Sequence, residues 1–277
     1  IDPKKWVTKH DAHRQTAIMV SAGPYLDYGA LHKFVKENPE AKMLAVKHAY
    51  PHLMEHGITP WGCILLDPRP ITGKSTHNIV RKDLFKNIDL NTNFFLASMT
   101  DPSVTNFMID KGVKLFGWHA FTDSLREEGE QGQQIQNQQV KIAEELGIPQ
   151  GATMITGGTC AAMRGIGMLH TMGFRDIHLF GFDCCRDEPS KEELTETTGD
   201  IEGGEIPKPK YMQVTVNEKE YWTTGELLAM AQDCEKVFQD DGLENALTFH
   251  GKDTMVADLW EISQSKKTRP EFEGFYK

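Results

Sequence analysis

Short apolar runs recur along the first two thirds of the chain, and most are followed by a turn and a stretch with helical spacing. The runs are TAIMVSA (16–22), MLAVKHA (43–49), WGCILLD (61–67), FFLAS (94–98), VKLFG (113–117) and DIHLFGFD (176–183). Their nearly continuous apolar character is typical of parallel strands that are buried on both faces. Strands that alternate with helices predict a doubly wound, mainly parallel α/β sheet, which is a Rossmann-like fold.

The last third of the chain has a different pattern. Residues 186–210 are charged and rich in glycine and proline, which predicts a long mobile lid loop. YMQVTV and YWTT flank residues 217–219 and predict a β-hairpin insertion, whereas residues 225–239 predict a helix and 247–251 a last short strand. The expected division is an N-terminal extension at 1–15, a Rossmann-like domain at 16–250 with the lid loop and hairpin at 186–224, and a C-terminal tail at 251–277.

Composition and charge limit the classes of partner. The chain has 277 residues, of which 39% are hydrophobic and 25% charged, so a buried core is expected. A formal net charge of -10 argues against a nucleic-acid partner, because phosphate backbones require clustered Lys and Arg. A small phosphate ligand needs only a local positive site. Residues 69–86 are the one basic stretch, which is either a solvated loop or part of such a site.

Cysteine usage and hydropathy favour a soluble, cytoplasmic protein. Five scattered cysteines with no CxxC pair predict neither a disulfide framework nor a zinc site. No apolar run reaches the length of a membrane span, and the first residues do not resemble a signal peptide. The first residue is Ile1, so we expect further residues upstream, and a homo-oligomer remains open.

Two glycine turns stand between a strand-like run and a helix-like run. They are SAGP at 21–24 and TGGT at 156–159. Glycine lets backbone N–H groups approach an anion closely, and a helix N-terminus adds a partial positive charge. Tight turns also occur without a ligand, but two at such junctions favour a nucleotide-type ligand at the carboxyl ends of the strands.

The donors in the first turn are restricted because Pro24 has no N–H group. Gly23, Tyr25 and Leu26 are therefore expected to supply the backbone donors, whereas the threonines of the second turn add hydroxyl groups. The residues predicted to bind the nucleotide are Gly23, Pro24, Tyr25, Thr156, Gly157, Gly158 and Thr159.

The sequence GKST at 73–76 is similar to part of a P-loop, but the full motif is absent. A P-loop requires glycine five positions before Gly73, where this chain has Pro68. Lys74 or Arg69 is still expected to reach a phosphate as a loop cation and to neutralise charge that develops during group transfer.

Two aspartates end predicted parallel strands. Asp67 ends WGCILLD, and Asp183 ends DIHLFGFD. Carboxylates at this edge point into the crevice where α/β sheets bind ligands, and the pair could hold Mg²⁺ with a polyphosphate. The alternative for each is a helix N-cap or a turn aspartate.

Other side chains carry weaker indications. His77, His119 and His250 lie in predicted loops at strand ends, where each is either a general base or a surface or structural histidine. The aromatic pair at 221–222 either stacks on a ligand ring or packs within the hairpin.

Three segments together resemble the MptE-like family, which includes archaeal 6-hydroxymethylpterin diphosphokinase and flagellin motility accessory factors. The segments are AIMVSAGPYLDYGAL, HGITPWGCILLDPRP and TGGTCAAMRGIGMLHTMGFRDIHLFGFDCC, and YMQVTVNEKEYWTTGELLAMAQ is also similar. The resemblance spans most of residues 16–240. The family's Gly-Pro-Ser-Leu turn has Tyr25 here in place of serine, whereas its Gly-Gly-Ser turn keeps a hydroxyl at Thr159. Its two aspartates match Asp67 and Asp183.

The resemblance implies nucleotide-dependent group transfer. The first expectation is a transferase of the diphosphokinase type that uses a nucleoside triphosphate such as ATP, with Mg²⁺, on a small acceptor. Bacterial sialyltransferases have a related first turn and a similar fold, so transfer from a CMP-sugar is the second. A non-catalytic nucleotide-binding module is the third, and the loss of a small hydroxyl at Tyr25 favours it slightly.

Overall fold

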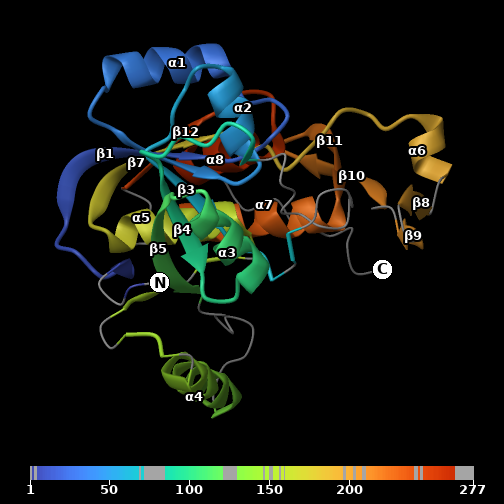
Figure 1. The fold of residues 1–277 in the computed structure, drawn as a ribbon. Coiled ribbons are helices and arrows are strands. Elements are labelled where there is room, and N and C mark those ends of the chain that lie inside the picture. Colours follow the sequence, from blue (N-terminus) through green and yellow to red (C-terminus); the bar gives the residue numbers. More distant parts are fainter. Residues whose placement is uncertain are drawn as a thin grey trace.

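The structure is a computed structural model (Figure 1). It describes residues 2, 5–68, 70–71, 85–120, 130–145, 147–149, 152–155, 157–158, 160–195, 198–201, 204–207, 210–239, 243 and 246–265.

One parallel sheet forms the centre of the molecule. Its strands are β1 (His13–Val20), β2 (Lys42–Val46), β3 (Gly62–Leu65), β4 (Asn93–Ala97), β5 (Lys114–Ala120), β6 (Met154–Ile155), β7 (Phe174–Phe180) and β12 (Leu247–His250). Their spatial order is β12-β7-β1-β2-β3-β4-β5-β6, and every neighbouring pair is parallel. The predicted doubly wound Rossmann-like sheet is thus confirmed. The chain runs outward from β1 to β6 and then returns to β7 on the other side of β1, so the topological switch point lies between β1 and β7.

Helices cover both faces of this sheet. They are α1 (Tyr28–Glu37), α2 (Ala49–Glu55), α3 (Pro102–Asp110), α5 (Ala161–Thr171), α7 (Gly225–Phe238) and α8 (Met255–Ser265). One core cluster joins Tyr50 of α2 and Val104 of α3 to Leu65 and Phe94. On the opposite face α5 approaches closely, because a Cβ on Gly165 would lie 2.5 Å from the Met19 Sδ. Figure 1 shows α4 (Glu130–Glu145) apart from the sheet.

The predicted hairpin is confirmed as β10 (Tyr211–Val216) paired with β11 (Lys219–Thr224). Its turn has two residues, Asn217 and Glu218, whose φ values of 51° and 65° match the type I′ turn that antiparallel strands favour. Lys219 therefore belongs to the strand and not to the turn. The predicted helix that follows is confirmed as α7.

The hairpin is attached to α8 through Asp258, which is buried in the first turn of that helix. One carboxylate oxygen accepts a hydrogen bond from the Tyr221 hydroxyl at 2.6 Å, and the other lies 2.8 Å from the Lys219 Nζ. Tyr221 therefore has a structural role, because its hydroxyl attaches the hairpin to α8. It packs in the main core cluster, in keeping with the packing alternative.

Three segments are more structured than their patterns predict. The segment expected as a lid loop contains α6 (Lys191–Thr195) and a second hairpin, β8 (Thr198–Ile201) with β9 (Gly204–Pro207). β1 begins inside the expected N-terminal extension, at His13. The expected tail contains α8, because Met255, Val256 and Leu259 bury their side chains in the core.

No helix among the described residues has the length and apolar character needed to cross a bilayer.

Candidate functional site

The carboxyl ends of β1 and β7 meet in a compact arrangement around Gly23 and Asp183. A Cβ on Gly23 would come within 2.5 Å of both the Asp183 Cγ and the Gly181 carbonyl oxygen, so only glycine allows this approach. The Asp183 Oδ2 accepts a hydrogen bond from the Tyr25 backbone N–H at 2.7 Å. The aspartate predicted at the end of the late strand therefore lies directly on the first glycine turn.

This arrangement changes the interpretation of the first turn. The Gly23 N–H donates to the Gly181 carbonyl at 2.9 Å, and the Leu26 N–H donates to the Gly23 carbonyl at 3.3 Å. The Tyr25 N–H donates to Asp183, so all three donors expected to face an anion are used within the chain. In addition, α1 begins only at Tyr28 and is capped by Asp27, so the turn is not the N-terminus of that helix.

Asp183 is a buried carboxyl at the switch point. Burial raises the pKa of Asp183 above its usual value, and the Tyr25 N–H partly offsets that shift. Tyr25 makes a second contact with the segment after β7, because its hydroxyl donates to the Asp187 Oδ1 at 2.6 Å. Tyr25 therefore closes the first turn onto that segment through both its backbone and its ring.

A row of polar side chains continues along the same edge of the sheet. The register pairs Leu65 with Leu96 and Leu96 with Gly117. Two residues further along, Asp67, Ser98 and His119 follow on three adjacent strands, and side-chain alternation places all three on the face covered by α2 and α3. Lys47 extends this row to β2, and we call these four residues the edge row.

The edge row consists of two bonded pairs. Lys47 and Asp67 form a buried ion pair. The Ser98 Oγ lies 2.6 Å from the His119 Nδ1, and either group donates, depending on the tautomer. Burial lowers the pKa of His119, and the positive charge of Arg164 on α5 lowers it further. His119 is therefore a neutral imidazole at neutral pH.

Asp67 and Asp183 do not fit the shared magnesium site predicted from the sequence. β3 and β7 are separated by β1 and β2, and three steps of about 4.8 Å place these strands about 14 Å apart. Asp67 is paired with Lys47, whereas Asp183 bonds Tyr25. A single ion cannot contact both carboxylates at this spacing. Within the described part of the chain, no group of three His, Cys, Asp or Glu side chains is arranged to hold a metal ion.

The second glycine turn lies before α5, as predicted. Gly157 and Gly158 have φ values of 116° and 44°, which an L side chain rarely adopts. A Cβ on Gly158 would lie 2.8 Å from the Asp233 Oδ2 of α7 and 2.9 Å from the Met163 Cβ. An anion bound at this turn would thus have a carboxylate close by, and a cation or a proton would have to offset the repulsion.

Four predicted site residues fall outside the described part of the chain, namely Arg69, Lys74, Thr156 and Thr159, and so does His77. Of the other predicted histidines, His119 lies within β5 and His250 within β12, and neither is in a loop. Sequence reasoning missed Lys47, Ser98 and Arg164. Lys47 and Ser98 each follow an apolar strand directly, which is the same signal that identified Asp67.

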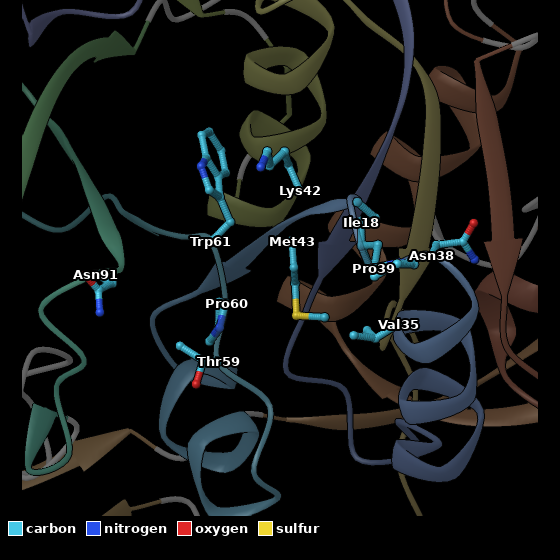
Figure 2. Close-up of a pocket in the computed structure, with 11 residues that line it drawn as sticks. Ile18, Val35, Asn38, Pro39, Lys42, Met43, Thr59, Pro60, Trp61 and Asn91 are labelled. Atoms are coloured by element: carbon cyan, nitrogen blue, oxygen red, sulfur yellow. The ribbon is translucent and has the colours of Figure 1, made fainter.

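The edge row is distinct from a cavity of about 280 Å³ at the opposite edge of the sheet (Figure 2). This cavity is lined by Lys42 and Met43 at the start of β2 and by Trp61 before β3, with Val35 of α1 beside them. Ligands of parallel α/β sheets bind at the carboxyl ends of the strands, so the cavity lies on the wrong side for the predicted nucleotide.

Comparisons with known proteins agree with this fold. The model of a family described as "6-hydroxymethylpterin diphosphokinase MptE-like" matches residues 3–189. Among solved structures, the chain is similar to the MAf glycosyltransferase from Magnetospirillum magneticum AMB-1, with a TM-score of 0.54 and 12% identity. That alignment covers 94% of this chain and 38% of the other, so this chain spans well under half of that protein. No curated protein matches the sequence.

Proposed function

Because the chain belongs to the MptE-like family, we propose that it is a nucleotide-dependent transferase that moves a group from a nucleoside triphosphate onto a hydroxyl of a small acceptor. The observation that carries this proposal is the edge row, which lies on the strands β2 to β5 that follow β1 along the carboxyl edge. It combines the ammonium group of Lys47, which its ion pair with Asp67 holds in place, with a neutral imidazole, at His119. Transfer to a hydroxyl requires both features, because charge develops on phosphate oxygens while a proton leaves the acceptor.

The donor lies along this edge, with its phosphates extending from the switch point to β2 and β3. Lys47 neutralises phosphate charge there, and its ion pair with Asp67 holds the ammonium group in place before the donor binds. The second glycine turn, at Gly157 and Gly158, would admit a phosphate from the opposite face only with a cation or a proton to offset the charge of Asp233. The first turn forms part of the wall of the site but offers a phosphate no N–H donors, because its N–H groups donate within the chain.

Mg²⁺ fits better at Asp183 than at Asp67. The ammonium group of Lys47 competes with a cation for Asp67. Asp183 uses one oxygen for the Tyr25 N–H, and a Mg²⁺ site commonly needs only one or two carboxylates beside substrate phosphates and water. When bound, the ion would neutralise phosphate charge close to the switch point.

Sugar transfer is the second candidate function. It is favoured by the similarity over 94% of this chain to a protein described as a glycosyltransferase. A CMP-sugar donor would use the same positive charge and the same proton acceptor, and only the bond that breaks would differ. A binding module without turnover is the third outcome that the experiment must separate.

The test is product analysis with purified protein and Mg²⁺. One reaction contains ATP with 6-hydroxymethylpterin as the acceptor probe, and the other contains CMP-sialic acid with a small sugar acceptor. Release of AMP with formation of a diphosphate ester supports the first function, whereas release of CMP supports the second. Nucleotide binding without either product supports the binding module.

A paired substitution tests the role of the edge row. Lys47→Gln combined with Asp67→Asn removes both charges and leaves a neutral pair of similar volume. We expect turnover to fall by about 10²-fold or more, because a preorganised charge is lost. Lys36→Gln, on the exposed side of α1, is the matched control and should leave turnover unchanged. Equal turnover of the paired variant and the control would exclude the edge row as the site.

A further inference from the structure

His119 occupies the position along the edge row that is furthest from the switch point. β5 is four strands from β1, whereas the charge of Lys47 lies beside β1 on β2. A donor that extends from the switch point past Lys47 has its transferred group directed toward β4 and β5. An acceptor hydroxyl that meets this group therefore approaches Ser98 and His119.

The imidazole of His119 is held in place before any ligand binds. The Ser98 backbone N–H donates to the Trp118 carbonyl at 2.8 Å, which joins the ends of β4 and β5. The fully buried Trp118 ring donates from Nε1 to the Phe95 carbonyl at 3.1 Å. The Ser98 Oγ then fixes the ring through Nδ1, and no described residue is hydrogen-bonded to Nε2.

The charge state of this histidine suits proton uptake. An imidazolium could not accept a proton, but burial and the cation of Arg164 keep the pKa of His119 low and the ring neutral. When Nδ1 donates its hydrogen to the Ser98 Oγ, Nε2 presents a lone pair to the acceptor. Arg164 itself is fixed, because its Nη1 donates to the Ile155 carbonyl at 2.7 Å.

We propose that His119 is the general base of the transfer reaction and that Ser98 is its positioning residue, an assignment that rests on the proposed function. The acceptor O–H bond breaks as its proton moves to Nε2, and the acceptor oxygen forms a bond to the transferred group. For ATP that bond is to the β-phosphorus, and the bond from this phosphorus to the bridging oxygen of AMP breaks. AMP leaves with that electron pair, and the proton on His119 then passes to water.

The experiment compares turnover, donor binding and pH dependence in His119→Gln and in the exposed control His52→Gln. The assay uses the donor and acceptor that give product with the wild type, and donor hydrolysis with water as the acceptor is measured alongside it. We expect kcat of His119→Gln to fall by about 10²- to 10⁴-fold, while the Kd of the donor stays within about threefold. The kcat of the wild type should decrease at pH values below the pKa of the histidine. The kcat of the variant should show no such decrease in acid.

Ser98 is tested by a matched pair of β-branched variants. Ser98→Thr keeps the hydroxyl and should retain most of the turnover, whereas Ser98→Val has a similar volume without it. Loss of the orienting bond is worth about 1 kcal/mol, so kcat of Ser98→Val should fall about fivefold or more with the donor Kd unchanged. A loss that is equal in both variants would make the role of Ser98 merely steric and would overturn its assignment.

Two results separate the inference from the proposed function. The general-base assignment is wrong, and the transferase function stands, if the wild type forms product and His119→Gln has a kcat within threefold of the wild type. The variant would then also show the same decrease of kcat at low pH. If the wild type binds a donor but forms no product and does not hydrolyse it, both the function and the assignment are wrong.

Discussion

The pair His178 and His250 predicts a specific loss of stability in acid. The His178 Nδ1 lies 2.7 Å from the His250 Nε2, and its Nε2 lies 3.1 Å from an Asp176 oxygen. The rings pack against Phe34 of α1, so protonation of both histidines would put two positive charges side by side in a partly buried position. Burial and, to a smaller extent, the neighbouring His178 together lower the pKa of His250 to about 4.

The sign of the effect follows from proton linkage. The pKa of His250 is lower in the folded state than in the unfolded chain, so the unfolded chain binds more protons below about pH 6.5. The stabilisation is therefore fully present above that value and is lost as the pH falls toward about 4. Between about pH 7.5 and pH 4.5, this single shift is worth roughly 2.5 kcal/mol of unfolding free energy.

The variant His250→Phe isolates this contribution. It removes the titrating group but keeps a flat ring against Phe180, whose plane is within 3° of that of His250. Urea unfolding at both pH values should give a loss that is about 2 kcal/mol smaller in the variant than in the wild type. An equal acid-induced loss in the two proteins would refute the reasoning.

Further predictions concern the first turn. Gly23→Ala should lower the unfolding free energy by about 1–3 kcal/mol in urea titration, because the new Cβ would overlap the Asp183 carboxylate, whereas Gly225→Ala should cost little, since its Cβ meets open space. Similar values for the two variants would contradict that packing. Tyr25→Phe removes the hydrogen bond to Asp187, so it should lower the unfolding free energy by about 1 kcal/mol and speed amide exchange just after β7. Unchanged exchange would show that the hydroxyl does not hold that segment.

The sheet could be predicted from the sequence because each strand can be identified from its own residues alone. A parallel strand buried on both faces is apolar along its length, so runs such as FFLAS identify it without any partner. The β10–β11 hairpin is equally local, since one short turn between two alternating segments fixes its register. The helix α8 was missed because MVADLWEISQS has few strong terminal signals, and its burial depends on contacts with β10, β12 and α7.

The site was predictable only in part. Asp67 and Asp183 lie two and three residues after β3 and β7, close to the predicted strand ends, but sequence order does not give the number of strands between them. The bond from the Tyr25 N–H to Asp183 joins residues 158 positions apart, so it depends on strand order alone. The Ser98–His119 contact likewise follows from register, which apolar runs do not specify by themselves.

The most direct test of the central claim is hydrogen exchange with and without saturating ATP and Mg²⁺. Our account predicts slower exchange at the carboxyl edge, in the peptides that contain residues 21–27, 47–49, 98–101 and 183–187. It predicts no change around Trp61 and Lys42, which line the cavity at the opposite edge. Protection confined to that cavity, or no protection of the carboxyl edge by ATP or by a CMP-sugar, would contradict a nucleotide-dependent site on the edge row.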